Sequence, residues 1–276
     1  MAPPSSLRPR PVSQQLIALA KTQQFYWFLG HVLAFINFGI QAVLFIWPSA
    51  SLKHYRFTLL SILITYVIVI KQIYFKRLSL SSVSLTRLAR DENVHYFVLA
   101  LTFYVASFKI GVIAGSLYLF IIFAVFHILT YFQNNLLAVL VPSIAAQQQI
   151  NTQINNFTLK FNQQALVLAA NAEVILAVLS GFQLIPAFLF QLLWSRQVVY
   201  FATKVVVFGV VLVFVKFRYD ANPYTKAVVD QFDARINAFV FGLNDQRLVA
   251  VYTKLKQDAL RFLAPIKVPK EEIKKN

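Results

Sequence analysis

Long apolar runs separated by short polar stretches dominate this chain. The clearest cover residues 25–47, 57–75, 94–132, 165–194 and 197–217. As a helix, residues 25–47 would be roughly 34 Å long, enough to cross a hydrocarbon core of about 30 Å. Tyr26, Trp27 and Trp47 bracket this run as interfacial anchors do. Residues 57–75 lack the alternation of a half-buried strand. The pattern therefore predicts membrane-spanning helices.

The later runs allow more than one count of spans. A single helix over 94–132 would be roughly 58 Å long, so we predict a hairpin of two short helices that turns near Lys109. The Asn- and Gln-rich residues 133–164 suggest a polar cytosolic connector with short helical pieces. Breaks at Gly181 and Pro186 make residues 165–180 a short span or a re-entrant helix.

The predicted fold class is an all-α, polytopic helical membrane protein. It has four to six membrane segments, some of them short or hairpin-like, and a C-terminal pair of amphipathic helices. We divide the chain into a flexible basic N-terminal arm (1–24), a transmembrane helical domain (25–217) and a cytosolic, basic, amphipathic-helical tail (218–276).

The tail carries recognisable helix signals. Asn222 followed by Pro223 predicts a capped helix that ends near Gly242, and Asn244 predicts the cap of a second helix that Pro265 stops. The second helix gathers its apolar residues within one arc. This pattern indicates a membrane-surface helix, with packing against the bundle or a partner as the alternative. The predicted membrane-binding residues are the apolar Leu248, Val251, Tyr252, Leu255, Phe262 and Leu263 and the basic Arg247, Lys254 and Arg261.

Composition excludes most soluble classes of protein. Hydrophobic residues make up 58% of the chain and charged residues only 13%, about half the share of a soluble domain. The net charge of +16 comes from 26 basic and 10 acidic residues, and 12 of the basic residues lie from position 216 onward. With an even number of crossings, the positive-inside rule places both termini in the cytosol. The basic tail suits anionic lipid, and no nucleic-acid-binding motif accompanies it.

Few residues suggest chemistry. The chain has no cysteine and no phosphate-binding glycine loop, and we predict no catalytic residue, metal or cofactor. Asn171, Glu173 and Lys204 are polar residues inside apolar runs, and an intramembrane carboxylate is a functional candidate. The structural alternatives are an interhelical ion pair of Glu173 or a protonated, hydrogen-bonded carboxyl, with Lys109 or Lys204 as partners. His95 and His127 are expected to meet on the cytosolic side, as a metal or acid-base cluster or as ordinary hydrogen-bonding residues.

Several short segments resemble the transmembrane protein 33 family, in the family's order. They are Asp91-Glu92-Asn93-Val94-His95-Tyr96, FAVFHILTY at 123–131, Asn171-Ala172-Glu173, Phe217-Arg218-Tyr219 with Asn222-Pro223-Tyr224, and RFLAP at 261–265. The resemblance implies a multi-spanning protein of the endoplasmic reticulum and nuclear envelope that supports nuclear pore complex assembly or distribution, or shapes tubular endoplasmic reticulum. It also implies a membrane-binding tail that meets a nuclear import receptor, and it supplies no catalytic residue.

We therefore expect a non-enzymatic protein that stabilises curved membrane at the nuclear pore membrane or in tubular endoplasmic reticulum. Expected partners are anionic, curved lipid, nucleoporins, reticulon-type proteins and a nuclear import receptor, and no nucleic acid. One alternative is a small transporter or membrane-embedded lipid enzyme that uses Glu173, Lys204, His95 and His127 in a shared cavity. Another is a membrane-anchored adaptor whose tail recruits a soluble partner.

Overall fold

The computed structural model describes residues 11–75 and 85–267, and every regular element in these ranges is helical. The first elements are α1 (Val12–Ala20), α2 (Gln23–Val43), α3 (Pro48–Tyr74), α4 (Leu85–Leu88), α5 (Glu92–Ile110), α6 (Tyr118–Tyr131) and α7 (Leu137–Leu140). They are followed by α8 (Ile144–Phe182), α9 (Leu184–Pro186), a π-helical segment (Ala187–Trp194), α10 (Val198–Ala221), α11 (Pro223–Gly242) and α12 (Gln246–Leu263).

Six helical stretches in the described part of the chain are long and apolar enough to cross a membrane. They are Gln23–Ile46, Pro48–Tyr74, Glu92–Ile110, Tyr118–Leu140, Ile144–Trp194 and Val198–Ala221. The predicted all-α polytopic class is confirmed. The six stretches equal the upper limit of the four to six membrane segments that the sequence predicts. Many large apolar side chains on these helices are exposed, as a lipid-facing surface requires.

The predicted turn near Lys109 is confirmed. Helix α5 ends at Ile110, and the connection to α6 contains Gly111 and Gly115 with φ of 75° and 81°. Both values lie in the left-handed region that glycine adopts without steric cost. Ser116 in this connection shares a hydrogen bond of 2.8 Å with Tyr55 of α3, which ties the turn to the bundle.

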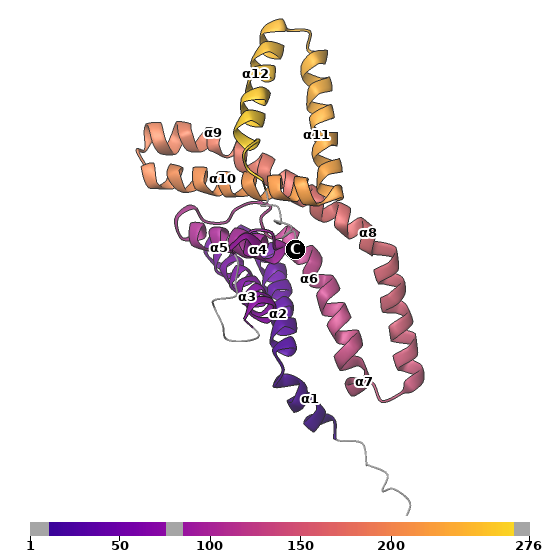
Figure 1. Cartoon of the computed structure of the whole chain (residues 1–276). Coiled ribbons are helices and arrows are strands. Elements are labelled where there is room, and N and C mark those ends of the chain that lie inside the picture. Colours follow the sequence, from indigo (N-terminus) through magenta and orange to yellow (C-terminus); the bar gives the residue numbers. More distant parts are fainter. Residues whose placement is uncertain (1–10, 76–84, 268–276) are drawn as a thin grey trace, which may run out of the picture.

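The polar connector predicted at 133–164 is wrong for most of its length. Residues from 144 onward form the first half of α8, a single helix of 39 residues. Asparagine and glutamine are polar but do not break a helix, and no Gly or Pro occurs between Ser143 and Ser180. Figure 1 shows α8 curving, so that its first half runs beside α6 and its second half beside α10.

Two boundaries near the termini also differ from the prediction. Residues 12–20 of the predicted flexible arm form α1, while 1–10 lie outside the described residues. The cap of α12 is Asp245, whose carboxylate accepts hydrogen bonds from the backbone of Arg247 and Leu248. Asn244 instead adopts a left-handed conformation with φ of 52°. Residues 76–84 and the end of the predicted basic tail, residues 268–276, also lie outside the described residues.

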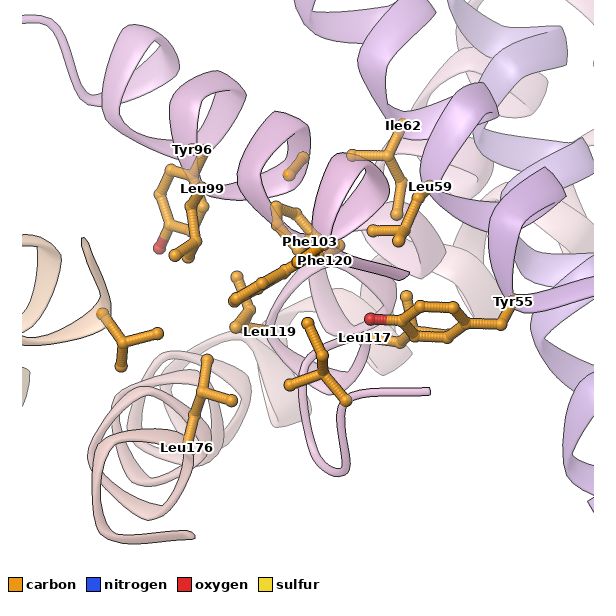
Figure 2. Packing of buried hydrophobic residues seen from close by; sticks show 14 of the residues in the cluster. Tyr55, Leu59, Ile62, Tyr96, Leu99, Phe103, Leu117, Leu119, Phe120 and Leu176 are labelled. Atoms are coloured by element: carbon orange, nitrogen blue, oxygen red, sulfur yellow. The ribbon is translucent and has the colours of Figure 1, made fainter. Parts of the chain in front are cut away.

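The apolar core lies where α3, α5, α6, α8 and α10 meet. Figure 2 shows side chains from α3, α5, α6, α8 and the α5–α6 connection packed together. The labelled residues are Tyr55, Leu59, Ile62, Tyr96, Leu99, Phe103, Leu117, Leu119, Phe120 and Leu176. Because the predicted membrane runs supply this core, the same residues that favour lipid also hold the helices together.

At Gly30, α2 packs against α3 with no room for a side chain. A Cβ atom at this position would lie 2.5 Å from the methyl group of Thr65 and 3.3 Å from the carbonyl oxygen of Ser61. Thr65 is buried, and its hydroxyl donates to the Ile62 carbonyl, so the methyl group has little room to move. Gly30→Ala is therefore expected to destabilise the protein by about 1–3 kcal/mol.

Gly39 on the same helix provides the matched control. A Cβ there would meet nothing within 4 Å. Gly39→Ala is expected to be neutral or to stabilise by up to about 1 kcal/mol, because alanine favours the helix. Thermal unfolding of both variants in detergent measures the difference. Equal midpoints for the two would contradict close α2–α3 packing at Gly30.

Candidate functional site

Glu173 is at the centre of a buried polar cluster. Its side chain is fully buried on α8, and three donors from three other helices reach it. Tyr96 of α5 donates to Oε1 at 2.6 Å, and Nε of Arg218 in α10 donates to the same oxygen at 3.0 Å. Thr225 of α11 donates to Oε2 at 2.7 Å. One carboxylate thus joins four helices, and we call these four residues the Glu173 hub.

The hub is assembled by helix ends. Asn222 caps α11 through hydrogen bonds from the backbone of Tyr224 at 2.9 Å and Thr225 at 3.2 Å. Pro223 occupies the first turn, where its missing N–H costs nothing. The cap fixes Thr225 one turn after α10 ends. Arg218 lies in the last turn of α10, where a cation is favoured by the helix dipole.

Within the hub, the charge of Glu173 is balanced by that of Arg218, and Glu92 outside the hub shares the same guanidinium. Nη1 of Arg218 lies 2.7 Å from a carboxylate oxygen of Glu92, so one guanidinium serves two carboxylates. The guanidinium also lies 5.5 Å from the centre of the Tyr96 ring. A buried ion pair stabilises a fold only when its remaining donors and acceptors are satisfied, and here hydroxyl groups complete the shell of Glu173.

Most segments that resemble the family converge on this hub. Tyr96, Glu173 and Arg218 belong to three of them, and the Asn222-Pro223-Tyr224 segment directly precedes Thr225. Asp91 caps α5 and accepts a hydrogen bond of 2.8 Å from Tyr74. Sequence motifs scattered over more than a hundred residues therefore describe one place in the structure.

The predicted partners of Glu173 are wrong. Lys204 donates to the side chain of Gln183 at 2.6 Å, and Lys109 is exposed in the last turn of α5. Asn171 donates to the carbonyl of Val167 in its own helix. The sequence does not identify Arg218 as the cation, because this residue follows the last apolar run and is assigned to the tail. In the folded chain Arg218 lies in the last turn of α10 and contacts Glu173 on α8.

The predicted pairing of His95 with His127 is also wrong. His95 shares a hydrogen bond of 2.8 Å with the Ala89 carbonyl, and its ring packs against Phe217 at 4.9 Å. The ring of His127 instead lies 4.8 Å from that of His31 on α2. The described residues contain no group of three or more His, Cys, Asp or Glu side chains that could hold a metal ion.

A cavity of about 450 Å³ lies beside the hub. Its lining includes His31, His127, Glu92 and Arg218. Three of the four residues proposed for a transporter or enzyme site are elsewhere, because Glu173, Lys204 and His95 do not line it. The cavity therefore does not match the catalytic or transport site expected from sequence.

The second candidate region is the tail. Figure 1 shows α11 and α12 as two neighbouring helices that project from the end where α8 and α10 meet. Tyr252 of α12 donates to Asn237 of α11 at 3.0 Å, and Lys256 lies 2.6 Å from Asp233. The hydrogen bond to Asp233 raises the pKa of the Lys256 ammonium, so this link is lost only as the pH rises beyond the ordinary lysine range.

Most of the predicted membrane-binding residues are exposed on α12. Leu248, Val251, Leu255 and Phe262 have exposed fractions of 50%, 57%, 64% and 69%. Tyr252 and Leu263 are half-buried. The basic Arg247, Lys254 and Arg261 are also exposed. The described part of the chain leaves the apolar face of α12 uncovered, while residues of α11 nearer the bundle, including Val228, pack on α8.

Comparison with known proteins gives a consistent result. The family described as Transmembrane protein 33/Nucleoporin POM33 matches residues 9–246. The chain is 35% identical to the Saccharomyces cerevisiae "Pore and endoplasmic reticulum protein of 33 kDa", over 80% of this chain and 82% of the relative. It is 28% identical to the "Pore membrane protein of 33 kDa" of the same organism, over 84% and 80%. "Tetra-spanning protein 1" of Schizosaccharomyces pombe is 27% identical over the same shares. No solved structure matches the chain significantly.

Proposed function

This chain belongs to the Transmembrane protein 33/Nucleoporin POM33 family, and from that premise we propose that it stabilises curved membrane at nuclear pores and in tubular endoplasmic reticulum. One relative is named as a pore and endoplasmic reticulum protein, and another as a pore membrane protein. In this proposal both termini lie in the cytosol, and the chain acts as a scaffold and catalyses no reaction.

The observation that carries the proposal is the uncovered apolar face of α12. Its exposed Leu, Val and Phe side chains stand beside basic residues, which is the composition of a helix that lies in the headgroup region of anionic lipid. Insertion of such a face expands one leaflet, and this favours curvature. The Glu173 hub supports the role, because Thr225 fastens the start of the α11–α12 pair to the spans.

The enzyme and transporter alternative has less support. Glu173 already accepts three hydrogen bonds, and it stands in a neutralising pair with Arg218, as a structural carboxylate does. Lys204 and His95 make separate bonds elsewhere. These contacts favour dispersed structural roles over a common reaction centre.

The adaptor alternative uses the same tail. An uncovered apolar and basic face also fits a soluble partner, and we keep a nuclear import receptor, nucleoporins and reticulon-type proteins as proposed partners. Lipid is preferred as the first ligand, because the face combines exposed leucine and phenylalanine with lysine and arginine on one amphipathic helix.

The location of the full-length tagged chain in cells tests the proposal. We expect puncta along the nuclear rim together with a reticular network, and we expect deletion of residues 244–276 to reduce the puncta and leave the network signal. Immunoblotting of both proteins controls for expression. A signal confined to the plasma membrane or Golgi, or puncta that persist unchanged without the tail, would contradict the proposal.

A further inference from the structure

The cavity beside the Glu173 hub has a size and a lining that suit a small ligand. Its volume of about 450 Å³ is within the usual range of small-molecule sites. Residues from α2, α3, α5, α6, α8 and α10 line it, so it lies inside the helix bundle. Tyr96 and Phe120, which Figure 2 shows among the packed core residues, also form part of its wall.

The walls are aromatic. Tyr66 and Tyr96 stack with their rings nearly parallel at 6.0 Å. On α2 and α6, the rings of Trp27, His31 and His127 approach one another pairwise at 4.6 to 4.9 Å. The faces of tryptophan and tyrosine rings attract organic cations through their quadrupoles.

The charge around the cavity is negative in sum. Glu92 and Glu173 contribute two negative charges, and Arg218 contributes the single positive charge that both share. The side chain of Glu92 is 54% exposed and lines the cavity, whereas Glu173 is behind Arg218 and does not. A cation that enters beside Glu92 would therefore meet a carboxylate that is only partly neutralised, because Arg218 also pairs with Glu173.

One wall also has an unused polar atom. Nε2 of His31 is buried and has no hydrogen-bond partner within the described ranges 11–75 and 85–267, and the residue is only 9% exposed. An unpaired buried ring nitrogen is unfavourable, because it has given up its hydrogen bonds to water and gained none in the protein. In one tautomer of neutral histidine this nitrogen is an acceptor, which an N–H donor in the cavity would satisfy.

We propose that the cavity binds a primary ammonium group. Glu92 provides the negative charge, Trp27 and Tyr66 provide ring faces, and His31 accepts a hydrogen bond. A quaternary ammonium ion would use the carboxylate and the rings but has no N–H for His31. The same chemistry is carried by phosphatidylethanolamine in the membrane and by free ethanolamine in solution, and the experiment separates these two sources.

Trp27 makes the site measurable in the full-length protein. The chain has three tryptophans, and the other two, Trp47 and Trp194, are 56% and 85% exposed and do not line the cavity. Trp47→Phe with Trp194→Phe leaves Trp27 as the only tryptophan. Its emission is recorded in phosphatidylcholine nanodiscs that contain increasing amounts of phosphatidylethanolamine. A second series replaces phosphatidylethanolamine by phosphatidylglycerol, which has no ammonium group. A third series adds free ethanolamine to nanodiscs of phosphatidylcholine alone.

We expect a saturable change in Trp27 emission with phosphatidylethanolamine. Saturation by the lipid alone identifies a lipid headgroup site, and saturation also by free ethanolamine shows that the amine suffices. An equal response to phosphatidylglycerol, or no saturable response to either amine, overturns the proposal.

Two substitutions test the assigned residues. Glu92→Gln removes the charge from a half-exposed side chain and is expected to weaken binding at least tenfold. Asp220→Asn, in the partly exposed pair with Lys216 and outside the cavity lining, should leave binding unchanged. His31→Phe keeps a ring but removes the acceptor and should weaken binding severalfold. His54→Phe outside the cavity is its control. Unchanged affinity in Glu92→Gln would overturn the site, and melting curves verify that each variant is folded.

Discussion

Arg218→Ala is expected to destabilise the protein by about 3–5 kcal/mol, the cost of leaving a buried carboxylate without its cation. Glu173 is fully buried, so its Oε1 would lose its charged partner at a position shielded from bulk water. Tyr96 and Thr225 would still donate hydrogen bonds, but two hydroxyl groups do not neutralise a charge. Thermal unfolding in detergent and the yield of monodisperse protein measure the effect.

The partly exposed ion pair on the same helix is the matched control. Lys216 and Asp220 are one turn apart on α10, and because water still reaches both side chains, Lys216→Ala should cost no more than about 1 kcal/mol. In an Arg218→Ala background, Glu173→Gln should recover much of the lost stability, because an amide can be buried without a counter-ion. If Arg218→Ala and Lys216→Ala melt at the same temperature, the hub does not hold the helices together.

Leu255→Asp combined with Phe262→Asp is expected to detach α12 from the membrane. Each apolar side chain contributes roughly 2 kcal/mol when it leaves water, so the pair should weaken contact with lipid at least a hundredfold. The measurement uses a tryptophan introduced by Val251→Trp on the same face, in the full-length chain with its three native tryptophans replaced by phenylalanine. Proteoliposomes that contain anionic and brominated lipid should quench this tryptophan, and the two Asp substitutions should abolish the quenching.

Charge reversal separates apolar insertion from electrostatic attraction. Lys254→Glu with Arg261→Glu leaves the apolar face intact, so quenching should fall at low salt and largely persist at high salt, where surface charges are screened. Undiminished quenching after the two Asp substitutions would mean that Leu255 and Phe262 do not hold α12 at the membrane, and the proposed route to curvature would fail.

The helices and their class followed from local pattern. Runs without charge that are long enough to cross a bilayer predicted the spans, and Asn222 with Pro223 predicted the start of α11 to the residue. Capping and hydrophobic periodicity depend on neighbours within one or two turns, so a sequence contains them directly. The glycine turn after Lys109 was found for the same reason.

The predictions of helix boundaries are wrong where they treat a run of polar residues as the end of a helix. The Asn- and Gln-rich residues before 165 have no Gly or Pro after the cap at Ser143, and the helix continues through them. Their polarity indicates which surfaces face water, whereas backbone geometry decides where a helix ends. The same reasoning missed α1 in the N-terminal arm.

By itself, then, the sequence determined the membrane-spanning helical class, the amphipathic face of α12 and the basic tail. Only the tertiary structure decided that Glu173 pairs with Arg218, that His127 meets His31 and that a cavity with Glu92 and Trp27 on its wall lies beside them. The physical reason is how far apart along the chain the interacting residues lie. Periodicity, caps and charge are local properties of a chain, but the choice among several cations for one buried carboxylate depends on how curved α8 and the end of α10 pack, which no local pattern specifies.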